Sequence, residues 1–314
     1  KVKIMRVFFK NIKSNILNYN RLYSIAISCF IIYLIFYVYD DLDFKKIIDT
    51  SKDIDFIFFI AAVLSLLCSH YFASMKYCFI VNKIISPRNK IKTGYIAYFS
   101  ALFANIVPFG PTADICRVTM LKANHQISLS NGFLISIIDR VSSAIYIAFI
   151  GVCFLILQLF YSYNLNIFKV LLVFWSLIVT VCIIFFFFPD LKIFEKKLIF
   201  GRRLLEVKRI LWLISFNSKV AFFTMAQFVF VSLSIIFCME SIINFKYNIY
   251  VILLTPFIQT LQTVPFFFGG WGIREASFLY LIPSNGSSQN INEILTISIL
   301  FGVCIFVSVL PSLL

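Results

Sequence analysis

Two arginines that lie in apolar sequence follow the same short pattern, Val-Pro-Phe and then seven further residues. The first copy ends at Arg117 and the second at Arg274. A carboxylate accompanies each arginine, Asp114 in the first copy and Glu275 in the second. A guanidinium group stays charged and binds phosphate through two parallel hydrogen bonds. The repeated pattern therefore predicts a pair of sites that hold an anionic, phosphate-bearing ligand.

The composition of the 314-residue chain is typical of a membrane protein. Hydrophobic residues make up 61% of it, charged residues make up 13%, and the mean hydropathy is +0.94. A soluble domain of this length would carry more surface charge. A membrane β-barrel would show short alternating segments instead of continuous apolar runs. We therefore expect an all-α fold, a polytopic membrane helical bundle that forms a single transmembrane domain over residues 1–314.

Apolar runs near the length needed to cross a bilayer predict about six full spans. They cover residues 22–39, 56–81, 132–158, 167–188, 219–238 and 292–314. Two further apolar segments, 93–123 and 249–283, are interrupted by proline and glycine, which break helices. The arms of the first, 93–108 and 111–123, would be about 24 and 20 Å long as helices, whereas the hydrocarbon core is about 30 Å thick. Each interrupted segment is therefore predicted to be a re-entrant hairpin that enters and returns on one side.

Lysine and arginine in the loops predict the orientation, because they accumulate on the cytoplasmic side. Residues 1–21 hold six basic residues and no acid, and residues 189–219 hold eight basic against three acidic residues. Residues 40–55, by contrast, hold six aspartates against three lysines. We expect an integral protein of the cytoplasmic (inner) membrane with both termini in the cytoplasm. The net charge of +14 then follows from topology, and no nucleic-acid partner is expected.

This orientation gives the duplicated pattern a geometry. The order span, span, hairpin, span describes residues 22–158, and the same order describes residues 167–314, which start on the opposite side of the membrane. Such an inverted repeat is the plan of many secondary transporters, whose binding sites lie where the two halves meet. The competing interpretation is coincidence, because Val-Pro-Phe is an easy match in a chain with 39 phenylalanines.

The candidate binding residues are charged or polar and lie in or beside the interrupted segments. They are Arg117, Arg274, Asp114, Glu275, Asp139, Arg140 and Asn105. Each acid among them has a basic residue within three positions, so each set can neutralise itself as an internal ion pair that fixes a hairpin to the bundle. The other interpretation is that the two arginines of the repeated pattern face a central cavity and hold a phosphate. The two interpretations are compatible, because an acid can hold an arginine until the ligand replaces it.

The helix breaks are candidate binding elements as well. Their residues are Pro108, Gly110, Pro265, Gly269, Gly270 and Gly272. Unwound backbone leaves N–H and C=O groups that need protein, water or ligand as partners inside a bilayer. Helices that restart near Thr112 and Trp271 would point their positive ends toward the middle of the protein, which suits an anionic headgroup.

Metal and nucleotide chemistry is not expected. The eight cysteines are scattered without a Cys-x-x-Cys pair, and the chain holds two histidines. These numbers and spacings do not fit a zinc or iron–sulfur site. The phosphate-binding pattern Gly-x-x-x-x-Gly-Lys-Ser/Thr is absent from the sequence, so we expect neither a cofactor nor direct use of a nucleotide.

Three motifs, taken together and in their order along the chain, resemble the transmembrane region of lysylphosphatidylglycerol synthases and related flippase-like proteins. The resemblance covers about residues 20–314. The motifs are Asn105-x-x-Pro108-x-Gly110-x-x-x-Asp114-x-x-Arg117, then Asp139-Arg140, then Pro265 followed by Gly269-Gly270-x-Gly272-x-Arg274-Glu275. The resemblance implies a bundle with re-entrant helices that binds or moves a lipid with a charged headgroup. Many relatives lie among genes for cell-surface polysaccharides and lipids. That context implies an aminoacyl phospholipid or a polyprenyl-phosphate-linked glycan as cargo, and a synthase as a partner protein.

The chain departs from the family pattern at two points of the first motif. Ala113 stands where a glycine is usual before the acid, and Pro111 stiffens the same turn, which leaves the shape of the first hairpin open. The bifunctional synthases of the family also carry a soluble aminoacyl-transfer domain. Nothing of that kind follows residue 314 here, so we do not expect this chain to make a lysyl-lipid by itself.

An enzyme is the alternative function. Asp40, Asp41 and Asp43 fall in the first predicted external loop. A membrane glycosyltransferase that uses a polyprenyl-phosphate sugar donor would place catalytic or metal-binding acids there. The simpler explanation is that external acids complement the basic cytoplasmic loops. An accessory subunit of a surface-glycan synthase is the third interpretation.

Overall fold

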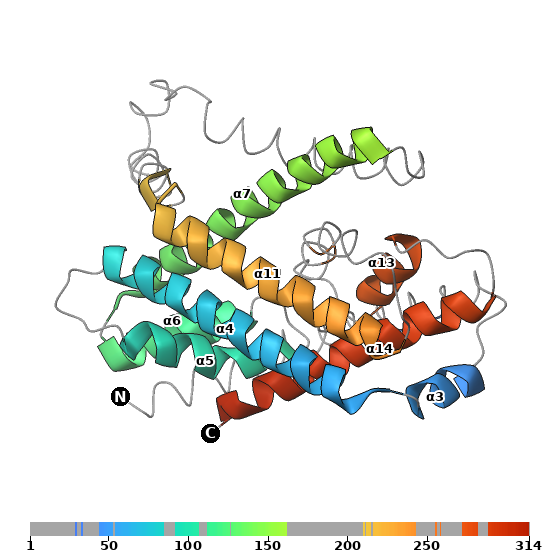
Figure 1. The fold of residues 1–314 in the computed structure, drawn as a ribbon. Coiled ribbons are helices and arrows are strands. Elements are labelled where there is room, and N and C mark those ends of the chain that lie inside the picture. Colours follow the sequence, from blue (N-terminus) through green and yellow to red (C-terminus); the bar gives the residue numbers. More distant parts are fainter. Residues whose placement is uncertain are drawn as a thin grey trace.

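The computed structural model in Figure 1 describes most of the helical bundle. The described residues are 44–52, 54–84, 92–106, 112–125, 127–161, 212–214, 216–242, 272–281 and 288–313, with the single residues 29, 33, 210, 255 and 258. Every regular element in these ranges is a helix. The all-helical prediction is confirmed for this part of the chain.

Four long helices correspond to four of the six predicted spans. They are α4 (Phe56–Ile84), α7 (Leu129–Tyr161), α11 (Ser218–Glu240) and α14 (Ser288–Val309), the last continued by the short 3-10 helix η1 (Leu310–Leu313). Each contains a stretch that is long and apolar enough to cross a membrane. The predicted span 22–39 is described only at residues 29 and 33, and the predicted span 167–188 lies outside the described residues. The number of six spans therefore stays a prediction.

Polar residues fix the first turn of three of these helices. The Asp55 carboxylate accepts a 2.8 Å hydrogen bond from the Ile57 N–H at the start of α4. At the start of α7 the Ser128 hydroxyl accepts a hydrogen bond from the Asn131 N–H. At the start of α11 the Asn217 side chain accepts one from the Lys219 N–H. The first N–H groups of a helix lack partners within it, so side-chain acceptors at these positions stabilise the helix ends.

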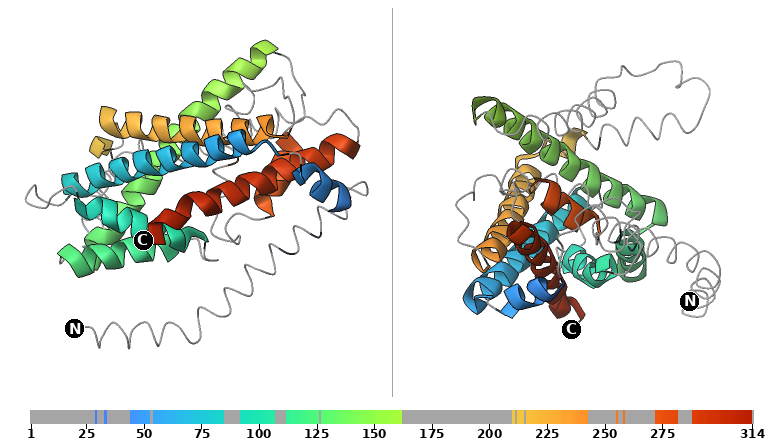
Figure 2. Two further views of the ribbon diagram at one scale, coloured as in Figure 1. Left: turned by 60° about the horizontal axis from the view of Figure 1, so that its bottom comes forward. Right: turned by 90° about the vertical axis from the view of Figure 1, so that its right-hand side faces the viewer.

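Helices α4 and α11 form the centre of the bundle and run in opposite directions, side by side (Figures 1 and 2). The N–H of Asp55 donates to the carbonyl of Ser241 over 3.2 Å, which joins the start of α4 to the end of α11. Further along, the Ser65 hydroxyl donates to the carbonyl of Phe230 over 2.8 Å. The Phe72 ring stacks on the Phe230 ring, with centroids 5.4 Å apart. These contacts join the two antiparallel helices at several points along the pair.

Small side chains allow this close approach. Ala62, Ser65, Ser69 and Ala73 of α4 are all buried, and their spacing of three or four residues places them on one helix face. In a bilayer, helix association depends on close van der Waals packing because lipid tails are as apolar as the side chains. The small stripe therefore explains why α4 lies at the centre.

The first interrupted segment forms two helices, α5 (Lys92–Ile106) and α6 (Thr112–His125). They pack against each other, and α5 also packs on α4 while α6 packs on α7. The predicted arms 93–108 and 111–123 are thus helical over most of their length. The turn between them lies outside the described residues, as does the predicted break at Pro108 and Gly110.

Before Gly272, the second interrupted segment is described only at residues 255 and 258, and from Gly272 onward it forms α13 (Ile273–Leu281). Helix α13 packs on α14. Figures 1 and 2 place α5 and α6 at one end of the bundle and α13 at the other. The break residues Pro265, Gly269 and Gly270 lie outside the described part of the chain.

Two apolar cores fill the two ends. One contains Tyr77, Tyr98 and their neighbours from α4, α5, α6 and α7. The other contains Phe278 of α13 and Phe301 of α14, whose ring centroids are 6.2 Å apart, together with residues of α4 and α11. The two repeated arginines therefore belong to separate packing units.

Helix α3 (Phe44–Lys52) was not predicted, because its residues belong to the acid-rich segment that we expected to be a loop. It packs on the start of α14, with Ile47 buried and Ile48 57% exposed. A helix this short depends on tertiary contacts more than on its own sequence, which explains why the charge pattern did not reveal it.

Candidate functional site

Helix α6 places the acid and the arginine of the first repeated pattern on one face. Asp114 is its third residue and Arg117 its sixth. Asp114 Oδ1 lies 3.6 Å from Arg117 Nη1. The i, i+3 pairing predicted from sequence is thus present, although both side chains have closer partners.

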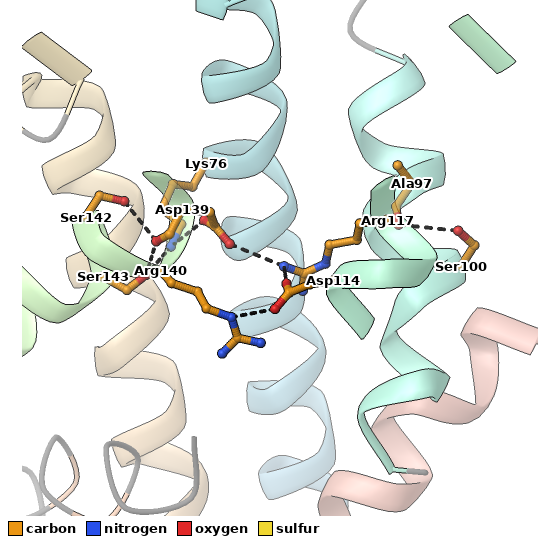
Figure 3. Close-up of polar contacts among 9 residues, drawn as sticks. All are labelled: Lys76, Ala97, Ser100, Asp114, Arg117, Asp139, Arg140, Ser142 and Ser143. Carbon is orange, nitrogen blue, oxygen red and sulfur yellow. Dashed lines mark hydrogen bonds and ion pairs between the residues drawn. The ribbon is translucent and has the colours of Figure 1, made fainter. Parts of the chain in front are cut away.

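Helix α7 supplies those closer partners. Asp139 Oδ2 lies 3.3 Å from Arg117 Nη1, and Arg140 Nε donates to Asp114 Oδ2 over 2.6 Å. We expected adjacent Asp139 and Arg140 to neutralise each other, and no ion pair joins them among the described contacts. Successive residues of a helix point about 100° apart, so each reaches a different side chain of α6 (Figure 3).

Lys76 of α4 completes the group, and the sequence analysis missed it. Its Nζ lies 2.9 Å from Asp139 Oδ1 and 2.5 Å from the Ser143 hydroxyl, to which it donates. The signal was present, because Lys76 lies inside the predicted span 56–81. A lysine within an apolar span is costly and marks a functional or paired position.

We call Lys76, Asp139, Arg117, Asp114 and Arg140 the charge cluster. In this order the charges alternate, beginning and ending with a cation. Three cations and two carboxylates give a formal charge of +1. The first four side chains are largely buried, with 3% exposure at Lys76, whereas the last, Arg140, is 44% exposed. The cluster therefore connects the packed interior of the bundle to its surface.

Two tyrosines enclose the central arginine. The Arg117 guanidinium carbon lies 4.6 Å from the ring centroid of Tyr98 on α5 and 5.2 Å from that of Tyr77 on α4. Aromatic faces attract cations at such distances. Arg117 Nε and the Tyr77 hydroxyl are nevertheless buried without a hydrogen-bond partner among the described residues. Buried donors normally have partners, so the cluster retains unused hydrogen-bonding capacity.

Arg274 and Glu275 form a second buried group, which we call the Arg274–Glu275 pair. Arg274 donates to Glu275 Oε1 from both Nε and Nη2, over 3.0 and 2.5 Å. Glu275 Oε2 accepts the Gly272 N–H over 2.6 Å. Glu275 thereby caps the start of α13 from its third position, where a negative charge is also favourable to the helix dipole.

The surroundings of this pair hold Arg274 tightly. Its Nε lies 3.3 Å from the Ser298 hydroxyl of α14, and a Cβ added at Gly302 would lie 2.5 to 2.8 Å from its guanidinium atoms. Gly302 therefore makes the space in which Arg274 lies. Gly272 has φ 85°, a left-handed conformation that glycine adopts without strain. The predicted break residue Gly272 thus has a clear structural requirement.

The structure divides the predicted site residues into these two groups, one on α4, α6 and α7 and the other on α13 and α14. Asn105 lies in the last turn of α5, and its side chain lies outside the described part, as do Asp40, Asp41 and Asp43. Ser298, Gly302, Tyr77 and Tyr98 were not predicted, because only tertiary packing brings them to the arginines. Within the described residues, no group of three or more metal-ligating side chains comes together.

Comparison with known proteins gives one family. A family model described as the lysylphosphatidylglycerol synthase TM region matches residues 21–312, nearly the whole chain. No curated protein and no solved structure matches the chain. The family match spans every helix that contributes to the charge cluster and to the Arg274–Glu275 pair.

Proposed function

Because the chain belongs to the lysylphosphatidylglycerol synthase transmembrane-region family, we propose that it binds a phosphate-bearing lipid and moves it across the membrane. The headgroup is held by the charge cluster, and the acyl or prenyl tail stays in the surrounding lipid. Anionic phospholipids and lipid-linked glycans share the phosphate that such a site recognises. The protein is an integral membrane protein with helices that span the bilayer.

The observation that carries this proposal is the surplus of cations in the charge cluster. Lys76, Arg117 and Arg140 face two carboxylates. A purely structural ion-pair network in a low-dielectric interior is most stable when its charges balance and its polar atoms are satisfied. Among the described residues one positive charge is left over, carried by the half-exposed Arg140. Arg117 Nε has no hydrogen-bond partner, and neither do Oδ1 of Asp114 and Oδ1 of Asp139. An anionic headgroup supplies the missing negative charge.

The packing supports an inverted-repeat route across the membrane. Helix α4 runs antiparallel to α11, which is its counterpart in the half-repeat scheme 22–158 and 167–314. Helix α6 packs on α7, and α13 packs on α14, as equivalent elements of two such halves would.

We assign the end of the bundle formed by α5 and α6 to the cytoplasm because basic loops flank it. Reporter fusions at each terminus test this orientation, and activity of both on the external side would contradict it.

The Arg274–Glu275 pair has a different role in this proposal. Its two charges balance, and Arg274 donates from Nε and Nη2 to Glu275 and from Nε to Ser298. It holds α13 on α14 in the conformation seen here. The sequence analysis predicted that Arg274 binds the headgroup. In this proposal it does so only in a later step of transport, if α13 moves away from α14.

The direct test is a translocation assay in proteoliposomes. Phosphatidylglycerol with a fluorescent acyl chain is incorporated, and a membrane-impermeant quencher reports its appearance in the outer leaflet. We expect wild-type protein to accelerate translocation and Arg117→Gln to reduce the rate at least about tenfold, the value of one charged hydrogen bond.

Lys122→Gln is the matched control. Lys122 lies on the same helix, is exposed and is outside the charge cluster, so its substitution removes the same charge without touching the site. A rate equal to wild type in the control and a reduced rate in Arg117→Gln supports the proposal. Equal rates in all three proteins, each above empty liposomes, would remove the charge cluster from the transport path.

A further inference from the structure

Two cysteines from different spans lie in contact inside the bundle, and we call them the thiol pair. Cys238 belongs to the last turn of α11 and Cys304 to α14. Their sulfur atoms are 3.8 Å apart, and both thiols are free. Both side chains are fully buried in the apolar core that also contains Phe278 and Phe301. A disulfide bond is about 2.0 Å long, so the two sulfurs need to approach each other by only about 1.8 Å more to form one.

The thiol pair borders the Arg274–Glu275 pair. Cys304 follows two residues after Gly302, which makes the space for the Arg274 guanidinium. Arg274 is also close enough to Cys238 to act on it electrostatically. Helix α14 therefore supplies both a wall of the space around Arg274 and one of the two thiols. A bond from this helix to α11 would keep that wall in place.

The thiol pair also lies toward the side of the membrane that we assign as external. Cys238 is two residues before the end of α11, which lies beside α14 (Figure 1). The same end of α11 is joined to the start of α4 through the hydrogen bond between Asp55 and Ser241, whereas the other end of α4 leads into α5 and the cytoplasm. Disulfides form and persist in the oxidising conditions outside the cytoplasm. The location therefore suits a reaction with an oxidant from the external side.

We infer that Cys238 and Cys304 form a redox switch, in which a small disulfide compound from the external side converts them into a disulfide that joins α11 to α14. The thiolate of one cysteine attacks the small disulfide and releases one thiol. The second cysteine then attacks the mixed disulfide and releases the other thiol. The protein loses two electrons and two protons, and the small disulfide gains both as it becomes two thiols.

The consequence for transport rests on the proposed function. There, Arg274 acts only when α13 moves away from α14 and the space around it opens. A covalent bond holds α14 on α11 and keeps the space closed, so the oxidised protein stops before that step. Reduction by a thiol reverses the exchange and restores movement.

The chemical step is tested with 4,4′-dithiodipyridine, a small disulfide, added to the purified full-length protein in lipid vesicles. We expect peptide mapping by mass spectrometry to find the peptides of Cys238 and Cys304 linked and two hydrogens lighter than their sum, and dithiothreitol to separate them. Cys68, an exposed cysteine of α4, reports that the reagent is active. If Cys68 reacts while the thiol pair stays free, or while each of its cysteines keeps a pyridyl group, the inference is overturned and the two cysteines only pack against each other.

The functional step is tested in the translocation assay before and after oxidation. We expect oxidised wild type to fall to the rate of empty liposomes and to recover with dithiothreitol. Cys238→Ala and Cys304→Ala should keep their rates after oxidation, and either variant suffices if the other does not fold. Cys78→Ala removes a buried thiol outside the pair and should respond as wild type does.

The outcomes separate the switch from the proposed function. Linked protein that translocates lipid as fast as reduced protein overturns the switch and leaves the proposed function intact. Equal inhibition of wild type and Cys304→Ala assigns the loss to other cysteines and also overturns the switch. Reduced wild type that is no faster than empty liposomes overturns the proposed function and, with it, the control of transport by the thiol pair.

Discussion

The two repeated arginines have the same neighbours in sequence and different environments in space. Arg274 contacts the Glu275 carboxylate and the Ser298 hydroxyl and lies in the space made by Gly302, so its charge is paired. Arg117 has two carboxylates that it shares with Lys76 and Arg140, two aromatic faces and one unpartnered nitrogen. Arg274 therefore fixes helix α13 in place, whereas Arg117 can exchange one partner for another.

The comparison shows that burial and ion pairing do not identify a binding arginine. Both arginines are buried, at 2% and 6% exposure. The local sum of charge distinguishes them, because a balanced group gains nothing from an anion while a group with a surplus cation does. Hydrogen-bond saturation points the same way. The predictions below test this contrast, beginning with the largest expected effect.

Removing the acid of the balanced group should have the largest effect on stability. Glu275→Gln leaves Arg274 charged, buried and without its counter-ion, which costs about 3–5 kcal/mol in the free energy of unfolding. Unfolding in mixed detergent micelles measures it. The double variant Arg274→Met/Glu275→Gln should recover most of the loss, because the unpaired charge is gone. A double variant as unstable as the single one would contradict the assignment as an ion pair.

The matching change in the charge cluster should be smaller and should respond to lipid. Asp139→Asn removes the carboxylate between Lys76 and Arg117, at a cost of about 3 kcal/mol in detergent without lipid. Added phosphatidylglycerol should restore part of this stability, because its phosphate takes the place of the carboxylate. The same lipid should not stabilise Glu275→Gln beyond its effect on wild type. If phosphatidylglycerol stabilised both variants equally, the charge cluster and the Arg274–Glu275 pair would not differ in their response to lipid, and the comparison would be contradicted.

A methyl group at Gly302 probes how tightly Arg274 is held. Gly302→Ala places a Cβ 2.5 Å from Arg274 Nη2, so the guanidinium must shift, and we expect a loss of about 2 kcal/mol in unfolding free energy. In the Arg274→Met/Glu275→Gln background the same substitution should cost less, and the difference is read from the double-mutant cycle. Strict additivity would show that Gly302 acts independently of the arginine.

The aromatic faces around Arg117 should give the smallest effect. Tyr98→Leu removes the closer ring, 4.6 Å from the guanidinium carbon, and should lower stability by about 1 kcal/mol. Lipid retention should fall less than in Arg117→Gln, because the charge remains. Tyr98→Phe is the control, since it keeps the ring. A loss in Tyr98→Phe equal to that in Tyr98→Leu would assign the effect to the hydroxyl.

The sequence predicted the four described spans and both arms of the first interrupted segment, because apolar length and helix-breaking residues are local properties. It also predicted Arg117, Asp114 and Asp139 as site residues. It did not predict their pairing, because Asp139 and Arg140 reach partners on other helices that depend on how α6 packs on α7. Lys76 was visible as a charge in a span and was overlooked.

Other residues left no signal in the sequence. Tyr98 is one of 15 tyrosines, and only packing shows that it faces Arg117. Gly302 lies within an apolar span, where glycine is common, and its role depends on the Arg274 side chain from another helix. The distinction between the two arginines was equally hidden, since it rests on the sum of charges contributed by three helices.

The most direct measurement compares the lipids that co-purify with three proteins: wild type, Arg117→Gln and Arg274→Gln. Mass spectrometry quantifies each lipid against the bulk membrane from which the protein was extracted. Our account predicts a phosphate-bearing lipid that is enriched in wild type, lost in Arg117→Gln and retained in folded Arg274→Gln. Enrichment that survives Arg117→Gln and disappears in Arg274→Gln would reverse the roles given to the two arginines and contradict the account.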